Sequence, residues 1–122
     1  MLGQFTAKHE ELKLSLSECA EPPALVLCVD GVLDSANSQD FFNAASLVLA
    51  DSRALGGLVL DLSSLSYLSS TGIGSMVSLL VASREQETSL YLRGMRPQVQ
   101  ALFDALGFNA FFSFLEAEGG AA

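Results

Sequence analysis

Three consecutive hydroxyl residues, Ser69, Ser70 and Thr71, have the clearest potential for chemistry in this chain. They follow a short apolar run at residues 58–62, which is typical of a strand inside a parallel sheet. They precede an apolar stripe with helical spacing and therefore stand at the start of a predicted helix. A helix N-terminus stabilises an anion through its N–H groups and its dipole. The pattern therefore predicts a turn that can carry a phosphate without unfolding the domain.

A phosphate on this turn would change the surface of the protein. It adds a charge of about −1.5 to −2, which is enough to switch an interface. Gly72 and Gly74 lack side chains, so the backbone of a partner could approach the turn closely. A plainer interpretation stays open, in which Ser69 or Ser70 only caps the helix and the glycines only allow tight helix–strand packing.

The elements around this turn alternate between strands and helices. Strands are predicted at 9–16, as an antiparallel edge-type strand, and at 24–29, 58–62 and 88–93. Helices are predicted to begin at Asn37 or Ser38, at Thr71, and at Pro97, the last one ending at Gly107. Their predicted core faces are Phe41, Ala44, Ala45 and Val48; Ile73, Met76, Val77, Leu80 and Val81, with serines 75, 78 and 83 outside; and Val99, Leu102, Phe103 and Leu106.

This alternation predicts an α/β fold with a mixed, mostly parallel β-sheet of four to five strands and helices after strands. The first two strands are expected to be antiparallel. With 122 residues the chain is expected to form a single domain, 1–122, with a core at about 10–115 and a flexible tail at 116–122. The aromatic cluster Phe108, Phe111, Phe112 and Phe114 is expected to close the core, and an exposed patch for self-association is the alternative.

Composition narrows the classes of function. The formal net charge is −8, and the six lysines and arginines are scattered, which argues against nucleic acid and anionic membranes and favours a protein partner with a basic face. We find no apolar run of membrane-spanning length and no signal-peptide pattern, so a cytoplasmic location is expected. Cys19 and Cys28 are expected to be unpaired thiols, with Cys28 in the core and Cys19 near the surface.

Catalytic patterns are weak in this chain. The single histidine, His9, has no neighbouring nucleophile or acid–base motif. Asp30, Asp34 and Asp61 fall near strand ends, where aspartate more often satisfies turns and caps than a metal. Residues 72–74 only partly match a dinucleotide-binding glycine motif. We therefore expect no enzyme activity, no metal and no cofactor.

Three segments resemble one known family. Residues 61–74, Asp-Leu-Ser-Ser-Leu-Ser-Tyr-Leu-Ser-Ser-Thr-Gly-Ile-Gly, are similar to the signature of STAS domains, especially bacterial anti-sigma factor antagonists. Residues 29–37, Val-Asp-Gly-Val-Leu-Asp-Ser-Ala-Asn, resemble the turn before the first helix of that family. Residues 92–107 resemble its penultimate strand and the helix that follows. The three occur in the expected order over residues 10–115, so the resemblance implies a STAS-like fold.

The resemblance also implies a functional site. It assigns the phosphoacceptor to Ser70, with Ser69 and Thr71 as alternatives. One departure stands out, because Ser69 occupies the position of an aspartate that the family implies to help present the serine to a kinase. The implied partner surface joins the turn at 34–37 to the start of the second helix and its exposed side; its residues are Asp34, Ser35, Asn37, Ser69, Ser70, Thr71, Gly72, Ile73, Gly74 and Ser75.

The implied function is that of a phosphorylation switch. The unphosphorylated protein would bind an anti-sigma factor that is itself a serine kinase, releasing the sigma factor for transcription, and phosphorylation of Ser70 would end that binding. The protein would act as a monomer or weak homodimer. Two other interpretations stay open: a STAS scaffold subunit that binds a transporter or lipid-trafficking partner constitutively, which Ser69 favours, and a small-molecule or nucleotide sensor.

Overall fold

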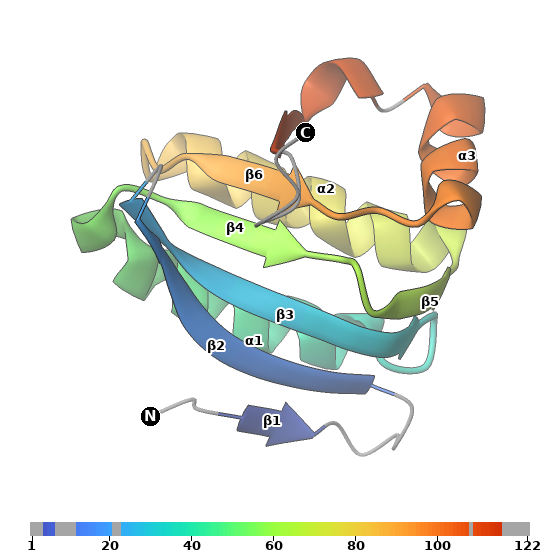
Figure 1. Ribbon diagram of the computed structural model, residues 1–122, viewed down its shortest axis with the longest axis horizontal. Helices are drawn as coiled ribbons and strands as arrows, with labels where there is room; N and C mark the ends of the chain where they lie inside the picture. The colour runs from blue at the N-terminus through green and yellow to red at the C-terminus, as the bar shows by residue number, and fades with distance from the viewer. Residues whose placement is uncertain (1–3, 7–11, 21–22, 108, 116–122) are drawn as a thin grey trace.

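Strands and helices alternate along the computed structural model (Figure 1), which describes residues 4–6, 12–20, 23–107 and 109–115. The strands are β1 (Gln4–Thr6), β2 (Leu12–Ala20), β3 (Pro23–Leu33), β4 (Leu58–Asp61), β5 (Leu65–Leu68), β6 (Leu90–Arg93) and β7 (Ser113–Leu115). The helices are α1 (Ser38–Ser52), α2 (Ser70–Glu85) and α3 (Pro97–Leu106), with short 3-10 helices η1 (Arg53–Leu55) and η2 (Asn109–Phe111).

All described strands belong to one mixed sheet with the order β1-β2-β3-β4-β6-β7. Outside this order, β5 pairs with the C-terminal end of β3. The β1–β2 and β2–β3 pairs are antiparallel, and all the other pairs are parallel. The predicted α/β fold and the antiparallel first pair are confirmed. The sheet has seven described strands instead of four to five, because β1, β5 and β7 are short and lack the continuous apolar run that marks β4. For the same reason β2 was wrongly predicted to be an edge strand, since β1 pairs with it.

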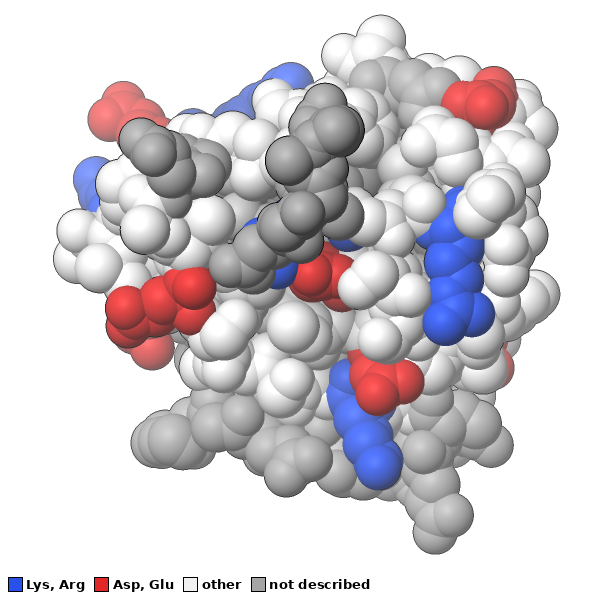
Figure 2. Space-filling view, viewed as in Figure 1, with Lys and Arg blue, Asp and Glu red and all other residues white. Residues whose placement is uncertain are grey.

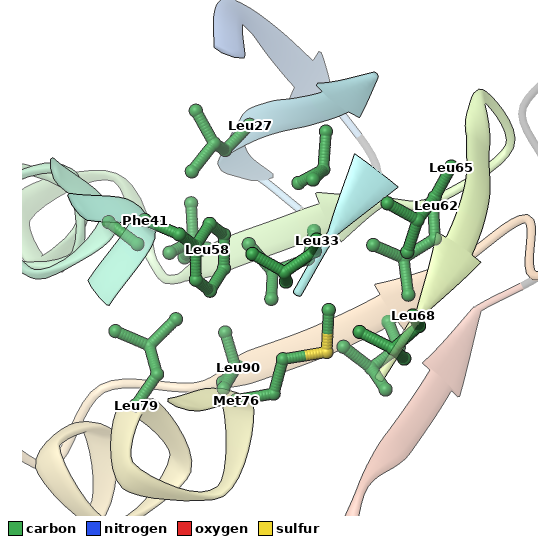
Figure 3. Close-up of a cluster of buried hydrophobic side chains, with 14 of the residues drawn as sticks. Leu27, Leu33, Phe41, Leu58, Leu62, Leu65, Leu68, Met76, Leu79 and Leu90 are labelled. Atoms are coloured by element: carbon green, nitrogen blue, oxygen red, sulfur yellow. The ribbon is translucent and has the colours of Figure 1, made fainter. Parts of the chain in front are cut away.

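One face of the sheet carries the main core. Helices α1 and α2 both lie behind the sheet in Figure 1, and the labelled side chains of Figure 3 point into the space between them and the strands. Strand β4 is buried because β3 and β6 flank it, which explains its continuous apolar sequence. The predicted core face of α1 is confirmed, since Phe41, Ala44, Ala45 and Val48 are all buried.

The predicted core stripe of α2 is partly wrong. Ile73, Met76 and Leu80 are buried, but Val81 is exposed and Leu79 is buried instead. Ser83 was expected outside and is buried, where its hydroxyl donates to the Leu80 carbonyl at 2.6 Å. A serine bonded to its own helix needs no outside partner, so the helix can turn this position toward the interior.

The last helix and the aromatic cluster follow the prediction only in part. Val99 and Phe103 of α3 are buried, whereas Leu106 is exposed; Gly107 ends the helix with a positive φ of 76°, as predicted. Phe112 is buried and meets the Phe103 ring edge to face, with centroids 5.7 Å apart, and so helps to close the core. Phe111 and Phe114 are exposed, and Phe108 lies outside the described residues, as do His9 and residues 116–122.

The opposite face of the sheet carries a smaller apolar cluster of Ala24, Val26 and Val59. Cys28 packs against this cluster and is half-buried, so its placement in the main core was wrong; Cys19 is also half-buried, and both thiols are free.

Figure 2 shows acidic and basic groups dispersed over this side of the molecule, without one continuous basic patch. Among the helices that the structure describes, none is long and apolar enough to cross a membrane.

Candidate functional site

The three hydroxyl residues lie where β5 passes into α2. Strand β5 runs parallel to the end of β3, with Leu33 paired to Leu68. The Ser69 N–H then donates to the Leu33 carbonyl at 3.0 Å, which fixes the point where the chain turns into the helix. Ser70 is the first residue of α2, and its side chain is exposed. The sequence-based placement of these residues at a helix N-terminus is therefore confirmed.

Ser69 and Ser70 have different environments. Ser69 is the N-cap of α2, because its hydroxyl accepts a hydrogen bond from the Gly72 N–H at 3.0 Å. Within the described residues, the Ser70 hydroxyl has no hydrogen-bond partner that would hold it against the protein. The capping interpretation thus applies to Ser69 and leaves the hydroxyl of Ser70 available at the surface.

The structure also gives a physical account of the departure at position 69. Serine and aspartate are about equally good N-caps, because each offers an oxygen to the same backbone N–H groups. Ser69 therefore keeps the geometry that an aspartate would give, and the difference that remains is one negative charge beside Ser70.

Two substitutions of Ser69 should affect stability differently. Ser69→Ala removes the cap and should lower the free energy of unfolding by about 1 kcal/mol. Ser69→Asp keeps the cap, adds a favourable charge at the helix N-terminus and should leave the stability unchanged or slightly raised. Chemical denaturation of both variants tests this, and equal destabilisation by the two changes would show that the cap contributes little.

The two glycines of the first turn have separate roles. A Cβ added to Gly72 would lie 2.7 Å from a methyl of Leu68 and 2.9 Å from the Leu33 carbonyl oxygen, so this glycine allows the helix to pack closely against the end of β3. Gly72 is buried and is not open to a partner, which corrects the expectation for this residue. Gly74 is exposed, and a Cβ there would meet nothing within 4 Å.

The turn at 34–37 lies beside this helix start because β3 and β5 end together. Asn37 is only 1% exposed, and its amide holds the turn by accepting from the Asp34 N–H at 2.9 Å and donating to the Val32 carbonyl at 3.0 Å. Asn37 is the N-cap residue of α1, one of the two predicted starts of this helix, but its side chain makes no capping hydrogen bond because the amide is engaged in the turn. Asp34 accepts from the Ala36 N–H at 2.9 Å, and Ser35 is exposed.

Two grooves flank the first turn of α2. The α1–α2 groove has a volume of about 410 Å³ and is lined by Ser38, Gln39, Phe42, Thr71, Gly74, Ser75 and Ser78. The β5–α3 groove has a volume of about 440 Å³ and is lined by Ser66, Tyr67, Leu68, Ser69, Ser70, Gln98, Val99 and Leu102. The sequence did not indicate Gln39, Phe42 or Tyr67 as site residues, because only the packing of separate elements brings them beside the hydroxyl residues.

The predicted partner-binding residues therefore divide into two groups. Asn37, Gly72 and Ile73 are buried, so they shape the surface and cannot contact a partner directly. The others are exposed or half-buried around the two grooves: Asp34, Ser35, Ser69, Ser70, Thr71, Gly74 and Ser75. The turn and the start of α2 lie near each other, because β3 and β5 end side by side; that a partner binds both stays a prediction.

An ion pair fixes the loop that leads into β5. The Arg93 guanidinium donates to one Asp61 carboxylate oxygen at 2.7 and 3.0 Å, while the other oxygen accepts from the N–H and hydroxyl of Ser63 at 2.9 and 2.6 Å. Burial alone would raise the pKa of the Asp61 carboxyl, but the hydrogen bonds from Ser63 and Arg93 outweigh it and lower that pKa. Burial, aided by the charge of Asp61, raises the pKa of the Cys28 thiol.

Asp61 and Asp34, two of the aspartates near strand ends, are used within the protein itself. Asp61 is engaged by Arg93 and Ser63, and Asp34 forms a turn with Ala36. No group of three or more histidine, cysteine, aspartate or glutamate residues gathers in the part of the chain that the structure describes.

Comparison with known proteins fits this geometry. The family model of the STAS domain matches residues 18–121 of the sequence, which is most of the chain. The chain belongs to the STAS domain family. The resemblance to STAS domains that the sequence motifs indicated is confirmed.

One relative in sequence and one solved structure of similar fold are named as anti-sigma factor antagonists. BtrV of Bordetella bronchiseptica, which is named as an anti-sigma factor antagonist, is 34% identical over 100 residues, which cover 80% of this chain and 83% of BtrV. The fold is similar to that of the anti-sigma factor antagonist SpoIIAA in its unphosphorylated form, with a TM-score of 0.68, 17% identity and coverage of 87% and 89%. The phosphorylated form of SpoIIAA from Bacillus gives a TM-score of 0.62, 16% identity and coverage of 87% and 92%.

Proposed function

We propose that this STAS domain is an anti-sigma factor antagonist that binds an anti-sigma factor and is switched off by phosphorylation of Ser70. The observation that carries the proposal is the exposed hydroxyl of Ser70 at the start of α2, next to a capping serine and between two grooves. The naming of BtrV as an anti-sigma factor antagonist supports the class of partner. Like other proteins of that class, it would act by binding, in the cytoplasm where transcription is regulated.

The partner would be a serine kinase that recognises the surface it modifies. Phosphate transfer requires the Ser70 oxygen to lie in line with the γ-phosphate of the nucleotide. After transfer, the phosphoserine faces the phosphates of the nucleotide product, and the two like charges repel each other. The same contact that allows phosphorylation therefore ends binding, while the helix N-terminus accommodates the phosphate without unfolding the domain.

Two substitutions of Ser70 test this switch. Ser70→Ala should retain partner affinity within about threefold and accept no phosphate, whereas Ser70→Asp should bind at least tenfold more weakly because it places a charge in the contact. Calorimetry with each purified serine-kinase anti-sigma factor of the protein's own organism measures both affinities. Equal affinity of the two variants would remove the switch from the proposal.

A charge at another exposed serine provides the control. Ser89 precedes β6, and its carbonyl accepts from the Leu58 N–H at the start of β4. It therefore lies at the N-terminal ends of the parallel strands, whereas Ser70 lies at their C-terminal ends. Ser89→Asp should therefore leave affinity unchanged.

Phosphorylation itself is tested by intact-mass analysis after incubation with the same kinases and ATP. A single phosphate mapped to Ser70 supports the switch. An unmodified protein that still binds an active kinase would favour constitutive binding, as a scaffold subunit does. Sizing of the protein over a wide concentration range tests whether it is a monomer or a weak homodimer.

A further inference from the structure

The β5–α3 groove contains residues that the predicted partner surface did not include, among them Tyr67, Gln98 and Leu102. The turn at 34–37 and the α1–α2 groove lie toward α1, whereas Ser69 and Ser70 themselves line the β5–α3 groove together with residues of α3. A partner that contacts the Ser70 hydroxyl therefore also reaches the β5–α3 groove.

Tyr67 is an aromatic residue of this groove that points away from the core. Packing of the core therefore does not account for an aromatic side chain at this position. In β5, Leu65 and Leu68 are buried in the core, while Ser66 and Tyr67 are exposed on the outside. The hydroxyl of Ser66 is used inside the protein, since it donates to the Gly31 carbonyl at 3.0 Å. Tyr67 is 54% exposed, and tyrosines in such positions are frequent anchors of protein interfaces.

The chemistry of the groove defines the group that it can take. Among the described residues that line it none is charged, although the protein carries a net charge of −8. Tyr67, Leu102 and Val99 supply apolar surface, with Ser66 and Gln98 among the polar groups. Burying a charged group here would leave it without a counter-charge from the lining, whereas an apolar side chain loses no hydrogen bond on entering. The groove therefore fits an apolar side chain better than a basic one.

We propose that the anti-sigma factor inserts an apolar side chain into the β5–α3 groove, against Tyr67 and Leu102, while it contacts Ser70. This proposal rests on the function proposed above and extends the partner surface across α2 to α3. The apolar contact then lies beside the hydroxyl that is phosphorylated.

Substitutions at two positions, Tyr67 and Gln98, test the groove without altering Ser69, Ser70 or Thr71. Tyr67→Ala removes the exposed ring and should weaken binding to the purified anti-sigma factor kinases of the same organism at least tenfold, whereas Tyr67→Phe keeps the ring and should bind within about threefold of wild type. Gln98→Glu adds a charge at an exposed position in the first turn of α3, where a carboxylate favours the helix. This variant should retain full stability and still bind more weakly.

Leu55→Ala is the matched control, because Leu55 is also an exposed apolar residue but lines neither groove. Its affinity should equal that of wild type. Wild-type affinity of Tyr67→Ala and Gln98→Glu, alongside weak binding of Ser70→Asp, would overturn the groove proposal and leave the proposed function intact. Failure of the wild-type protein to bind any of these kinases would overturn both.

Discussion

Gly72→Ala should unfold at a lower denaturant concentration than wild type, and Gly74→Ala at a higher one, although the two glycines are only two residues apart in α2. The methyl group at position 72 would meet the Leu33 carbonyl oxygen at 2.9 Å. That oxygen also accepts the Ser69 N–H, so it cannot move away without weakening the turn. Overpacking of this kind lowers the free energy of unfolding by about 1–3 kcal/mol.

Gly74→Ala is the matched control for that effect. A Cβ at this exposed position meets nothing within 4 Å, and alanine favours a helix over glycine by about 0.5–1 kcal/mol. Urea unfolding followed by circular dichroism compares the two variants directly. If both changes shifted the midpoint in the same direction, the close approach of α2 to β3 would not be the reason for glycine at position 72.

The same control variant also reports on the partner surface. Gly74 lines the α1–α2 groove, so its added methyl group occupies space that the proposed partner would enter. Gly74→Ala would then be more stable than wild type and yet bind the anti-sigma factor more weakly. Stability and affinity would move in opposite directions, which loss of folding cannot produce.

Asp61→Asn should destabilise the protein by about 3–5 kcal/mol, because it removes one charge from a buried ion pair. Asp61 is 16% exposed and Arg93 is 6% exposed, so the guanidinium would lose its carboxylate where water reaches it poorly. The asparagine oxygen can still accept from the backbone of Ser63, so the loss reports mainly on the charge. Thermal and urea unfolding measure it.

Asp34→Asn is the control for the loss of a negative charge. Asp34 is also a turn-forming aspartate, but within the described residues it has no ion-pair partner, so its replacement should change the stability by no more than about 0.5 kcal/mol. A similar loss from both substitutions would assign the effect to turn geometry and not to the ion pair.

The acid side of the stability curve provides an independent test of the ion pair. The pKa of the Asp61 carboxyl is lower in the folded protein than its ordinary value of 3.8. Its contribution to stability is therefore fully present above that value and is lost as the pH falls through the folded pKa. The stability difference between wild type and Asp61→Asn should be constant near neutral pH and shrink in acid. A difference that stayed constant down to about pH 2 would mean that the pKa of Asp61 is not lowered.

The amino-acid sequence by itself determined the order of the main elements and the position of the hydroxyl turn. Apolar runs and helical spacing are local patterns, so they predicted β4, the start of α2 and the end of α3 at Gly107. Motifs in register also identified the family, while the phosphoacceptor role of Ser70 stays a prediction from that resemblance. Strands β1, β5 and β7 left no such signal, because their three or four residues contain neither a continuous apolar run like that of β4 nor enough positions to show a period.

Only the tertiary structure decided how the residues of the site divide between support and contact. Ser69 and Ser70 are the same residue type, and their roles differ because the Leu33 carbonyl fixes the chain so that only Ser69 points back to the Gly72 N–H. Gly72 is buried and Gly74 is open because one side of α2 packs on β3. Tyr67 comes beside Leu102 through the packing of β5 against α3, which are distant in sequence. Such relations depend on the distances between elements, and no local pattern encodes them.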